Sequence, residues 1–377
     1  MRGSAIAFRR NAEKSSGCEN KRMVNTMQAV VLHGREDLRV ETVPVPAVGP
    51  GDLLLRVGAA LTCGTDLKVF RRGYHAKMLV PPAVFGHEIA GTIIATGDGV
   101  AGFKAGDRVV ASNSAPCGSC LFCRRQQPNL CNDLLFNNGA YAEYIRIPAR
   151  IVQKNTLRVP DGVSFQHAAL MEPLACVVLG LEQCNPRPGD TVVVLGAGPI
   201  GLMFIRTAHI SGCRVIAVVK RDDQVASARR FGADEVVQIA DGVDTVTAVR
   251  ALTEEEEGAD IVVECVATPA TWEQSVAMVR KGGVVNFFGG PPSGTVVALD
   301  TNRLHYGDIT LKATFHHTPA TNRTAFELIT GGRMRAEDFI TATSSLRDVP
   351  EVFRRMLVRS AIGTLDIKTA ILPEQAA

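Results

Sequence analysis

Four cysteines fall within fifteen residues of this chain, in the pattern Cys117-x2-Cys120-x2-Cys123-x7-Cys131. Four thiolates at short spacing on one loop form the ligand set of a closed, tetrahedral zinc site. A redox-active Cys-x-x-Cys pair is one alternative. An iron–sulfur cluster uses similar spacing and is a second alternative that residue types leave open. The pattern favours structural zinc.

Three further residues with metal-binding side chains are scattered along the chain: Cys63 in Cys-Gly-Thr-Asp, His87 in Gly-His-Glu and Glu172 in Met-Glu-Pro. Each has an ordinary structural explanation when taken alone. A single Cys is usually a small buried hydrophobic residue, and a single His is usually structural. Glu before Pro usually begins a turn or a helix. Their spacing therefore leaves a second metal site undecided.

A glycine motif points to a phosphate-bearing ligand. The apolar run 191–195 leads directly into Gly196-Ala-Gly198-Pro199-Ile200-Gly201, and a helix-compatible stretch, 202–210, follows. The first glycine permits a tight turn, the second lets the backbone approach a pyrophosphate, and the third lets the helix pack closely on the strand. The N-terminus of that helix would face the phosphates with its free N–H groups. The motif predicts a dinucleotide site.

The elements that must position these residues differ along the chain. From residue 191 onward, apolar runs alternate with helical segments, which predicts a doubly wound parallel α/β sheet of Rossmann type. The predicted strands are 191–195, 215–219, 235–238, 261–266, 284–288 and 309–314. Between about residues 28 and 176, short β-like runs separated by Gly and Pro predict a β-rich lobe that carries the cysteine loop. A last apolar run, 361–372, is expected to rejoin that lobe.

Length and composition exclude several classes of function. A chain of 377 residues is long enough for two domains, each with its own core. Its 41 basic and 38 acidic residues are scattered, so nothing indicates nucleic-acid binding, and no long apolar stretch predicts a membrane span. Ten cysteines are too few for a disulfide scaffold, which favours the reducing cytoplasm. Residues 1–26 lack helical or strand periodicity, and we expect a disordered leader there.

The order and spacing of these motifs resemble the medium-chain zinc-dependent alcohol dehydrogenases, and within them the sorbitol and threonine dehydrogenase branch. The resemblance runs from about Met27 to the C-terminus and rests on Cys63-Gly-Thr-Asp, Gly86-His-Glu, Gly106-Asp-Arg-Val, the four-cysteine loop, Glu172-Pro-Leu and Gly196-x-Gly-x-x-Gly. It implies a GroES-like catalytic domain made of residues 27–176 and 315–377, with a dinucleotide-binding Rossmann domain at 177–314 between them. It also implies two zinc ions per chain, one catalytic and one structural.

The resemblance assigns Cys63 and His87 to the catalytic zinc. Glu88 and Glu172 both match positions that can supply a carboxylate ligand, and the sequence does not choose between them. A shell of Cys, His and Glu balances Zn2+ with two negative charges and leaves one position for water or a substrate oxygen. Zinc would polarise the alcohol oxygen while the nicotinamide takes the hydride, so the reaction needs no protein nucleophile.

Other side chains around this site are assigned in the same way. Asp66 matches the carboxylate that fixes the orientation of His87, and Thr65 matches the hydroxyl that passes the substrate proton toward solvent. Many relatives have a His three residues after that hydroxyl, whereas this chain has Lys68. Lys68 is either part of the proton path or substrate site, or simply an exposed lysine.

The resemblance also implies a nicotinamide cofactor, and the end of the second Rossmann strand bears on which one. NAD-specific enzymes usually place an acid there, about 20 residues beyond the glycine motif, but this strand ends in Lys220-Arg221. An Arg can pair with a 2'-phosphate and a nearby Lys adds charge, so the pair favours NADP. The alternative is that Asp222 or Asp223 reaches the ribose of NAD. Val266 and Phe288, at the ends of two later predicted strands, are also expected to bind the cofactor.

The function that follows is hydride transfer between a secondary alcohol, such as a polyol, cyclitol or sugar alcohol, and NAD(P). A basic segment, 68–75, suits a polar substrate better than an apolar one. A threonine-type amino-alcohol dehydrogenase is one alternative, and a non-catalytic protein that binds zinc and cofactor is another. Relatives imply a homodimer or homotetramer.

His316 and His317 follow the sixth predicted strand, and because neighbouring strand residues point to opposite sides, at most one should face the cleft.

Overall fold

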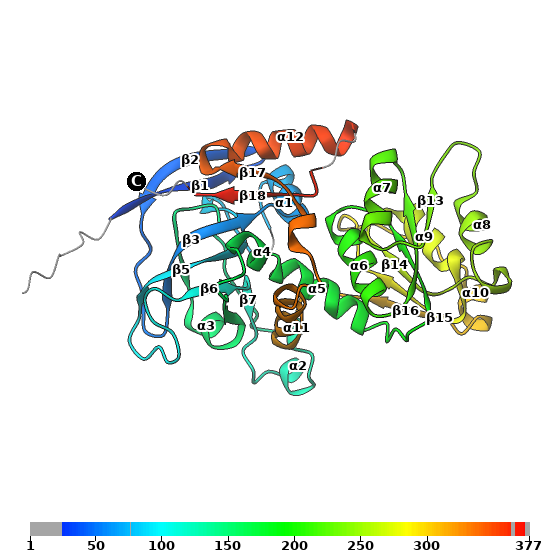
Figure 1. Cartoon of the computed structure of the whole chain (residues 1–377), viewed down its shortest axis with the longest axis horizontal. Coiled ribbons are helices and arrows are strands. Elements are labelled where there is room, and N and C mark those ends of the chain that lie inside the picture. The colour runs from blue at the N-terminus through cyan, green and yellow to red at the C-terminus, as the bar shows by residue number, and fades with distance from the viewer. Residues whose placement is uncertain (1–24, 76, 363–365, 374–377) are drawn as a thin grey trace, which may run out of the picture.

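The structure, a computed structural model, describes residues 25–75, 77–362 and 366–373. Two lobes lie side by side along the long axis of the molecule (Figure 1). One lobe is rich in strands and contains both the first and the last described strands, while the other comes from the middle of the chain. Apart from its last two residues, the predicted leader at 1–26 lies outside the described residues.

The second lobe holds a six-stranded parallel sheet in the order β13-β12-β11-β14-β15-β16. Its strands are β11 (Thr191–Leu195), β12 (Arg214–Val219), β13 (Glu235–Gln238), β14 (Ala259–Glu264), β15 (Val279–Phe287) and β16 (Thr310–Ala313). Its helices are α6 (Pro199–Ile210), α7 (Asp222–Phe231), α8 (Thr245–Arg250), α9 (Pro269–Met278) and α10 (Thr301–Tyr306), with the short 3-10 helix η2 (Glu254–Glu256). This strand order is that of a Rossmann fold. The six predicted strands are confirmed, although β15 begins well before its predicted start.

The strands of this Rossmann lobe are apolar at consecutive positions because helices cover both faces of the sheet. In β11, Val192 and Val194 pack into the core on the side of α6, whereas Val193 and Leu195 pack into a separate core that includes residues of α9. All four side chains are buried. A continuous Val-rich run is therefore what a central strand of this sheet requires.

The β-rich lobe is built around a sheet in the order β10-β6-β5-β3-β18-β17, with β9 also paired to β3. These strands are β3 (Leu53–Leu61), β5 (Glu88–Thr96), β6 (Arg108–Ala111), β9 (Tyr144–Ile147), β10 (Thr156–Arg158), β17 (Ile340–Ser345) and β18 (Lys368–Leu372). Two smaller sheets contain β1 (Thr26–Gly34), β2 (Asp37–Pro44) and β4 (Ala83–Val84), and β7 (Ser114–Ala115) with β8 (Leu135–Phe136). Its helices are α1 (Gly64–Arg72), α2 (Leu121–Arg124), α3 (Ala149–Asn155), α4 (Phe165–Ala169) and α12 (Val349–Ile362), with the 3-10 helices η1 (Pro128–Leu130), η3 (Ala336–Asp338) and η4 (Leu346–Asp348).

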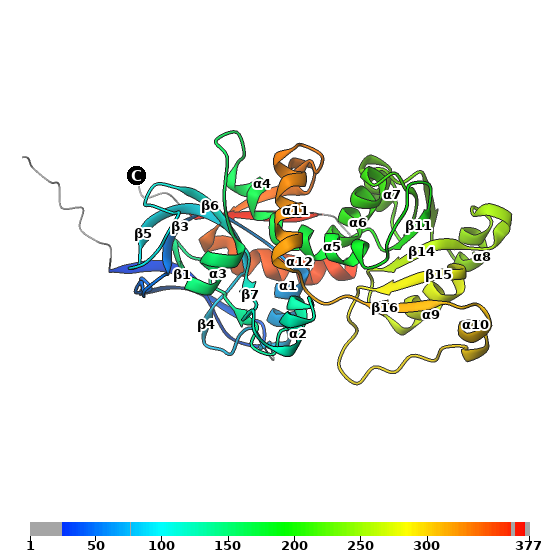
Figure 2. The same ribbon diagram turned by 90° about the horizontal axis from the view of Figure 1, so that it is seen from below.

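The chain leaves the β-rich lobe once and returns to it. Helices α5 (Met171–Glu182) and α11 (Pro319–Thr330) pack against each other between the two lobes in both views (Figures 1 and 2). After α11, the chain returns to the β-rich lobe, where β17 and β18 join its largest sheet and β18 pairs antiparallel with β3. Helix α5 runs without a break across residues 176 and 177, so the domain boundary placed there stays a prediction.

The helices of both lobes are short. Within the described part of the chain, none is long and apolar enough to cross a membrane. The longest, α12, has 14 residues, whereas a membrane span needs about 20.

Two neighbouring glycines of the 196–201 motif should respond differently to the same substitution. A Cβ at Gly201 would lie 1.8 Å from the carbonyl oxygen of Gly196, whereas a Cβ at Gly198 would meet nothing within 4 Å. Gly201→Ala should therefore cost about 1–3 kcal/mol in overpacking and lower the melting temperature by several degrees. Gly198→Ala is the matched control and should melt as the native chain does. Equal melting temperatures for the two variants would contradict this account of the turn.

Candidate functional site

Cys63 and His87 meet because two adjacent strands position them. Cys63 follows β3 and is the N-cap residue of α1, and His87 immediately precedes β5. Strands β3 and β5 are antiparallel, with Leu61 opposite Glu88. The chain just after Leu61, which carries Cys63, therefore lies beside the chain just before Glu88, which carries His87. The ligand atoms of Cys63, His87 and Glu88 all lie within 4.8 Å of one another. Sequence positions far apart thus form one cluster.

A buried carboxylate holds His87 in one orientation. Asp66 Oδ1 accepts a hydrogen bond from His87 Nδ1 at 2.8 Å, and Asp66 Oδ2 accepts one from the Tyr141 hydroxyl at 2.7 Å. Burial, reinforced by the charge of Asp66, raises the pKa of Tyr141 well above its usual value, so the hydroxyl keeps the proton it donates. The bond to Asp66 therefore uses Nδ1 of His87, which leaves Nε2 on the side of Cys63 as the candidate ligand atom. Sequence reasoning did not identify Tyr141.

The carboxylate of Glu88 is hydrogen-bonded to a lysine that lies 280 positions later in the chain. Lys368 Nζ donates to Oε1 and Oε2 of Glu88 at 2.8 and 2.7 Å, and also to the carbonyl oxygen of Thr62 at 2.8 Å. Both charged side chains are buried. Burial works against the charge of Lys368, but the carboxylate of Glu88 outweighs it and raises the pKa of the lysine. The negative charge of Glu88 is therefore balanced within the protein.

Glu172 lies in a second cluster beside the first. It stands in the first turn of α5, and its carboxylate lies with the rings of His316 and His317 in a group whose ligand atoms are within 4.8 Å of one another. Glu172 Oε1 is 3.7 Å from His317 Nε2. Burial raises the pKa of Glu172 to about 7. Unlike Glu88, this carboxylate has no lysine bound to it in the described residues.

The prediction that His316 and His317 point to opposite sides is wrong. Their ring centroids are 4.0 Å apart, and both contribute to the cluster with Glu172. Strand β16 ends at Ala313, and His316 has a left-handed backbone with φ of 67°, so the alternation of a strand does not apply. His317 Nδ1 accepts from Asn322 Nδ2 at 3.2 Å. Burial lowers the pKa of His317, which is therefore neutral.

The four predicted thiol ligands converge on one point of the loop. The sulfur–sulfur distances are 3.6 Å for Cys120–Cys123, 3.8 Å for Cys120–Cys131 and 3.9 Å for Cys117–Cys123. A tetrahedron of sulfurs around zinc has edges of about 3.8 Å, because each zinc–sulfur bond is about 2.3 Å long. Backbone amides of Ser119 and Cys120 donate to Cys117 and lower its pKa to about 6, which favours the thiolate. The donor set fits a tetrahedral metal ion.

The glycine motif has the local geometry that its spacing predicts. Gly196 has φ of 94°, and Gly198 is the N-cap residue of α6 with Pro199 as the first helical residue. Val266 lies beside this turn, since a Cβ on Gly196 would approach Val266 Cγ2 to 2.8 Å. Its side chain is 45% exposed, which is unusual for a Val at the end of a core strand. The N-terminus of α6 and Val266 thus form one surface that can receive a dinucleotide.

Two other predicted cofactor residues, Ile200 and Phe288, are partly buried and pack against the core. The ring of Phe288 contacts Phe204 edge to face with centroids 4.9 Å apart. Contact of Phe288 with a cofactor stays a prediction.

A buried carboxylate that sequence reasoning missed stands at the same end of the sheet. Glu264, the last residue of β14, accepts through Oε1 from the amides of Val266 and Ala267 and from the Thr271 hydroxyl. Burial raises its pKa. Its Oε2 has no hydrogen-bond partner in the described residues. Glu264 therefore fixes the backbone of the turn that carries Val266.

Of the basic pair Lys220-Arg221 at the end of β12, the arginine already has a carboxylate partner. Arg221 is the N-cap residue of α7, and its Nε lies 3.1 Å from Asp223 Oδ1. Asp222 accepts a 2.6 Å hydrogen bond from Gln238 Nε2. The Lys220 side chain is exposed. Both acids that offered an alternative contact to the ribose thus have partners of their own.

Lys68 links the two lobes. It lies on α1, whose N-cap is Cys63, and its Nζ donates to the carbonyl oxygen of Gly290 at 3.4 Å, just beyond β15. Burial lowers the pKa of Lys68, and the charge of Arg72 lowers it further. The carboxyl end of the Rossmann sheet therefore lies beside the helix that begins at the first candidate metal ligand. Thr65, on the first turn of the same helix, is half-buried.

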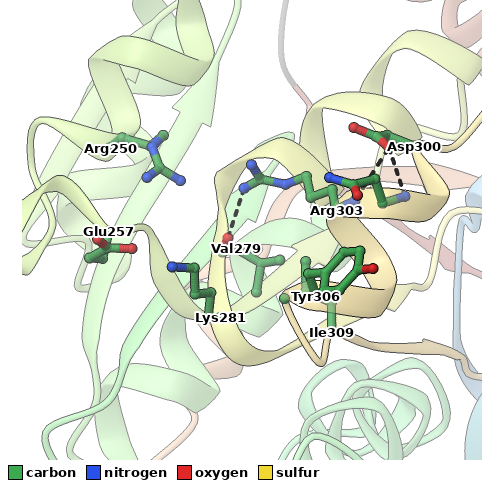
Figure 3. A pocket seen from close by; sticks show the side chains of 10 residues that line it. Arg250, Glu257, Val279, Lys281, Asp300, Arg303, Tyr306 and Ile309 are labelled. Carbon is green, nitrogen blue, oxygen red and sulfur yellow. Dashed lines mark hydrogen bonds between the residues drawn. The ribbon is translucent and has the colours of Figure 1, made fainter.

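A pocket of about 330 Å³ lies elsewhere, between α8, α10 and the start of β15 (Figure 3). Its Arg303 donates to the carbonyl oxygens of Val276, Ala277 and Val279, and Asp300 caps α10. These charged groups stabilise the ends of helices. The pocket contains none of the predicted site residues.

Comparisons with known proteins agree with this arrangement. Residues 49–161 match the family model described as alcohol dehydrogenase GroES-like domain, and residues 199–331 match zinc-binding dehydrogenase. The chain is 33% identical to L-threonine 3-dehydrogenase of Pyrococcus abyssi over 85% of this chain and 91% of that protein. It is 29% identical to sorbitol dehydrogenase of Bacillus subtilis over 88% and 94% of the two chains. A zinc-binding dehydrogenase from Sinorhizobium meliloti, bound to NADP, superposes with a TM-score of 0.84 at 28% identity, covering 92% of this chain and 99% of that one.

The chain thus combines a GroES-like lobe with a Rossmann lobe, the architecture of an oxidoreductase that brings a metal site and a nicotinamide site together. It belongs to the zinc-dependent medium-chain alcohol dehydrogenase family.

Loss of one thiol from the four-cysteine loop should destabilise the protein. Cys120→Ser removes one corner of the sulfur tetrahedron, and metal bound at such a site contributes folding free energy directly. We expect loss of one zinc per chain and a lower melting temperature. Cys213→Ser is the control, because Cys213 is a free cysteine outside both clusters. A Cys120→Ser protein that keeps its zinc content and melting temperature would contradict a structural role.

Proposed function

We propose that this enzyme oxidises secondary alcohols of the polyol, cyclitol or sugar-alcohol class, and reduces the matching ketones, with NAD(P). The observation that carries the proposal is the contact of Lys68 with Gly290. It puts the helix that starts at Cys63 next to the carboxyl end of the Rossmann sheet, where a nicotinamide would lie. Hydride transfer needs the alcohol carbon and the nicotinamide to be neighbours.

Each residue of the site has a distinct task in this proposal. Cys63 and His87 hold the catalytic zinc, which supplies Lewis-acid polarisation of the substrate oxygen when bound. Asp66 binds Nδ1 of His87 and so directs Nε2 toward the zinc, and Tyr141 fixes Asp66 in turn. Thr65 passes the alcohol proton toward solvent.

Glu172 is the proposed third ligand rather than Glu88. Glu88 lies closer to Cys63 and His87, but both of its oxygens bind Lys368, and the pair is already neutral. Moving Glu88 onto a metal would leave a buried lysine without its partner, which is costly. Burial raises the pKa of both glutamates, but no lysine is bound to Glu172 among the described residues, so a divalent metal would supply the charge that Glu88 already receives from Lys368.

The polar surroundings support a polyol substrate. His316, His317 and Asn113 lie next to Glu172 and make this part of the site polar. Sorbitol dehydrogenase of Bacillus subtilis is among the similar proteins. A threonine-type amino alcohol is the second candidate, favoured by the identity to the Pyrococcus abyssi enzyme. In that case Lys68 or its basic neighbours would bind the carboxylate.

The remaining parts of the proposal concern the environment and assembly of the enzyme. We infer two zinc ions per chain, a cytoplasmic location and a homodimer or homotetramer. In support of the location, the described cysteines are all free thiols, as expected in a reducing compartment.

The catalytic assignment predicts a graded set of losses. Assayed by nicotinamide absorbance against a panel of polyols, cyclitols and hydroxy amino acids, the native enzyme should oxidise polyols. Cys63→Ala or His87→Ala should abolish turnover and remove one of two zinc ions while leaving the fold. Asp66→Asn should lower activity or zinc affinity by about 10–100-fold, since it disturbs only the orientation of a ligand. Normal turnover in Cys63→Ala would rule out the assignment.

The same zinc measurement separates the two glutamates. Glu172→Gln should lose the catalytic zinc. The matched control is the double variant Glu88→Gln with Lys368→Met, which removes both charges of the buried pair and should keep two zinc ions per chain. The opposite pattern would identify Glu88 as the ligand.

Cofactor choice gives a separate test. We propose NADP over NAD, because Lys220 and Arg221 stand at the end of β12, Asp222 is bonded to Gln238, and Asp223 pairs with Arg221 itself. Arg221→Ala should lower kcat/KM with NADP about tenfold or more, the usual effect of losing a charged hydrogen bond, and leave NAD nearly unaffected. If the native enzyme prefers NAD, or if Arg221→Ala loses kcat/KM equally with both cofactors, the proposed preference for NADP is wrong.

A further inference from the structure

A second pocket, of about 350 Å³, lies where the Rossmann lobe meets the returning chain. It is lined by Arg206, Arg230, Phe231, Arg335, Asp338 and Phe339. Arg206 belongs to α6 and Arg230 to α7, both labelled in Figure 1, whereas Arg335 and Asp338 belong to the segment between α11 and β17. Three arginines from three separate elements therefore converge on one pocket.

Backbone carbonyls hold two of these arginines in place. Arg206 donates through Nε and Nη2 to the carbonyl oxygen of Arg333 at 3.2 and 3.1 Å. Arg230 Nη2 donates to the carbonyl oxygen of Asp338 at 3.3 Å. Behind them, the buried rings of Phe231 and Phe339 pack with centroids 4.5 Å apart. Carbonyl acceptors orient a guanidinium group but leave its positive charge uncompensated.

The charge of the pocket is unbalanced. Three guanidinium groups line it and one carboxylate, Asp338, faces them. That carboxylate lies 3.3 Å from Arg335 Nε, and Glu337 lies at the same distance from the same atom. Arg206 and Arg230 have no carboxylate partner within the described residues. Arg335 is thus already paired with two carboxylates, and the uncompensated charge is that of Arg206 and Arg230, which repel one another unless an anion lies between them.

We propose that this pocket binds the phosphate group of a small molecule. Guanidinium groups supplied by three separate elements suit a tetrahedral group with several acceptor oxygens better than a planar carboxylate, which pairs with a single guanidinium group. The ligand is not the nicotinamide cofactor. Arg206 and Arg230 lie in the C-terminal halves of α6 and α7, whereas the glycine motif and Arg221 are at the N-termini of the same helices.

A phosphate in this pocket would bridge both parts of the molecule. It would contact α6 and α7 of the Rossmann lobe and also the segment that leads into β17 of the β-rich sheet. The phosphate can come from the free ion or from a phosphate ester, and both present the same group to the arginines. This inference does not depend on the alcohol substrate proposed above.

Calorimetric titration at constant ionic strength tests the site, with inorganic phosphate, pyrophosphate and glycerol 3-phosphate as probes. The native chain should bind pyrophosphate saturably at this site. Arg230→Gln or Arg335→Gln should weaken binding about tenfold or more. Asp338→Asn should tighten it severalfold, because the variant removes the carboxylate that faces the ligand. Arg229→Gln, a change of an exposed arginine beside Arg230 that does not line the pocket, is the matched control and should change affinity less than twofold.

The outcomes separate this site from its alternatives. If Arg229→Gln weakens binding as much as Arg230→Gln, the probe is attracted by the general positive charge of this surface rather than by a specific site, and the proposal fails. If saturating NADP abolishes the binding, the probe occupies the cofactor site and the proposal also fails. Absence of binding to the native chain at millimolar probe overturns it as well. Tighter binding of glycerol 3-phosphate than of inorganic phosphate would identify an ester as the ligand, and equal binding the free ion. Should Arg230→Gln not fold, Arg335→Gln carries the test, since that side chain is exposed.

Discussion

One buried ammonium group lies behind the two stretches of backbone that carry the first candidate metal ligands. Lys368 donates to the carbonyl oxygen of Thr62 and to both oxygens of Glu88. Thr62 immediately precedes Cys63, and Glu88 immediately follows His87. The hydroxyl of Thr62 also accepts from the amide of Thr369. A single lysine near the C-terminus therefore ties together the backbone on which the two metal ligands stand, and burial makes its loss expensive because Glu88 would be left charged and unpaired.

Local patterns in the sequence were enough to predict features formed by neighbouring residues. The four cysteines lie on one loop, so their spacing alone brings the sulfurs to tetrahedral distances. The glycine motif is similarly self-contained, since the strand, turn and helix it requires are consecutive in the chain. The alternating apolar runs predicted the Rossmann strands because a buried parallel strand needs apolar side chains on both faces.

Features formed by residues distant in the sequence could not be predicted in this way. Tyr141 reads as an aromatic residue between two alanines, and only the fold places its hydroxyl on Asp66. Lys368 reads as a charged residue opening an apolar run, yet it is buried. The error for His316 has a local cause, because a left-handed backbone after β16 breaks the alternation assumed for a strand. The proposal of Glu172 over Glu88 likewise rests on a partner 280 positions away from Glu88.

The split of the β-rich lobe also constrains how the molecule can form as it leaves the ribosome. All strands of the Rossmann sheet lie between Thr191 and Ala313, so that lobe is complete before the final segment has been made. Strand β3 is synthesised early, and β9 can pair with its first half, but its end at Ala60 and Leu61 must wait for β18 and until then has unpaired backbone groups. The nascent chain therefore carries an unfinished sheet edge while its middle is already able to fold, and the last strand to emerge closes that edge.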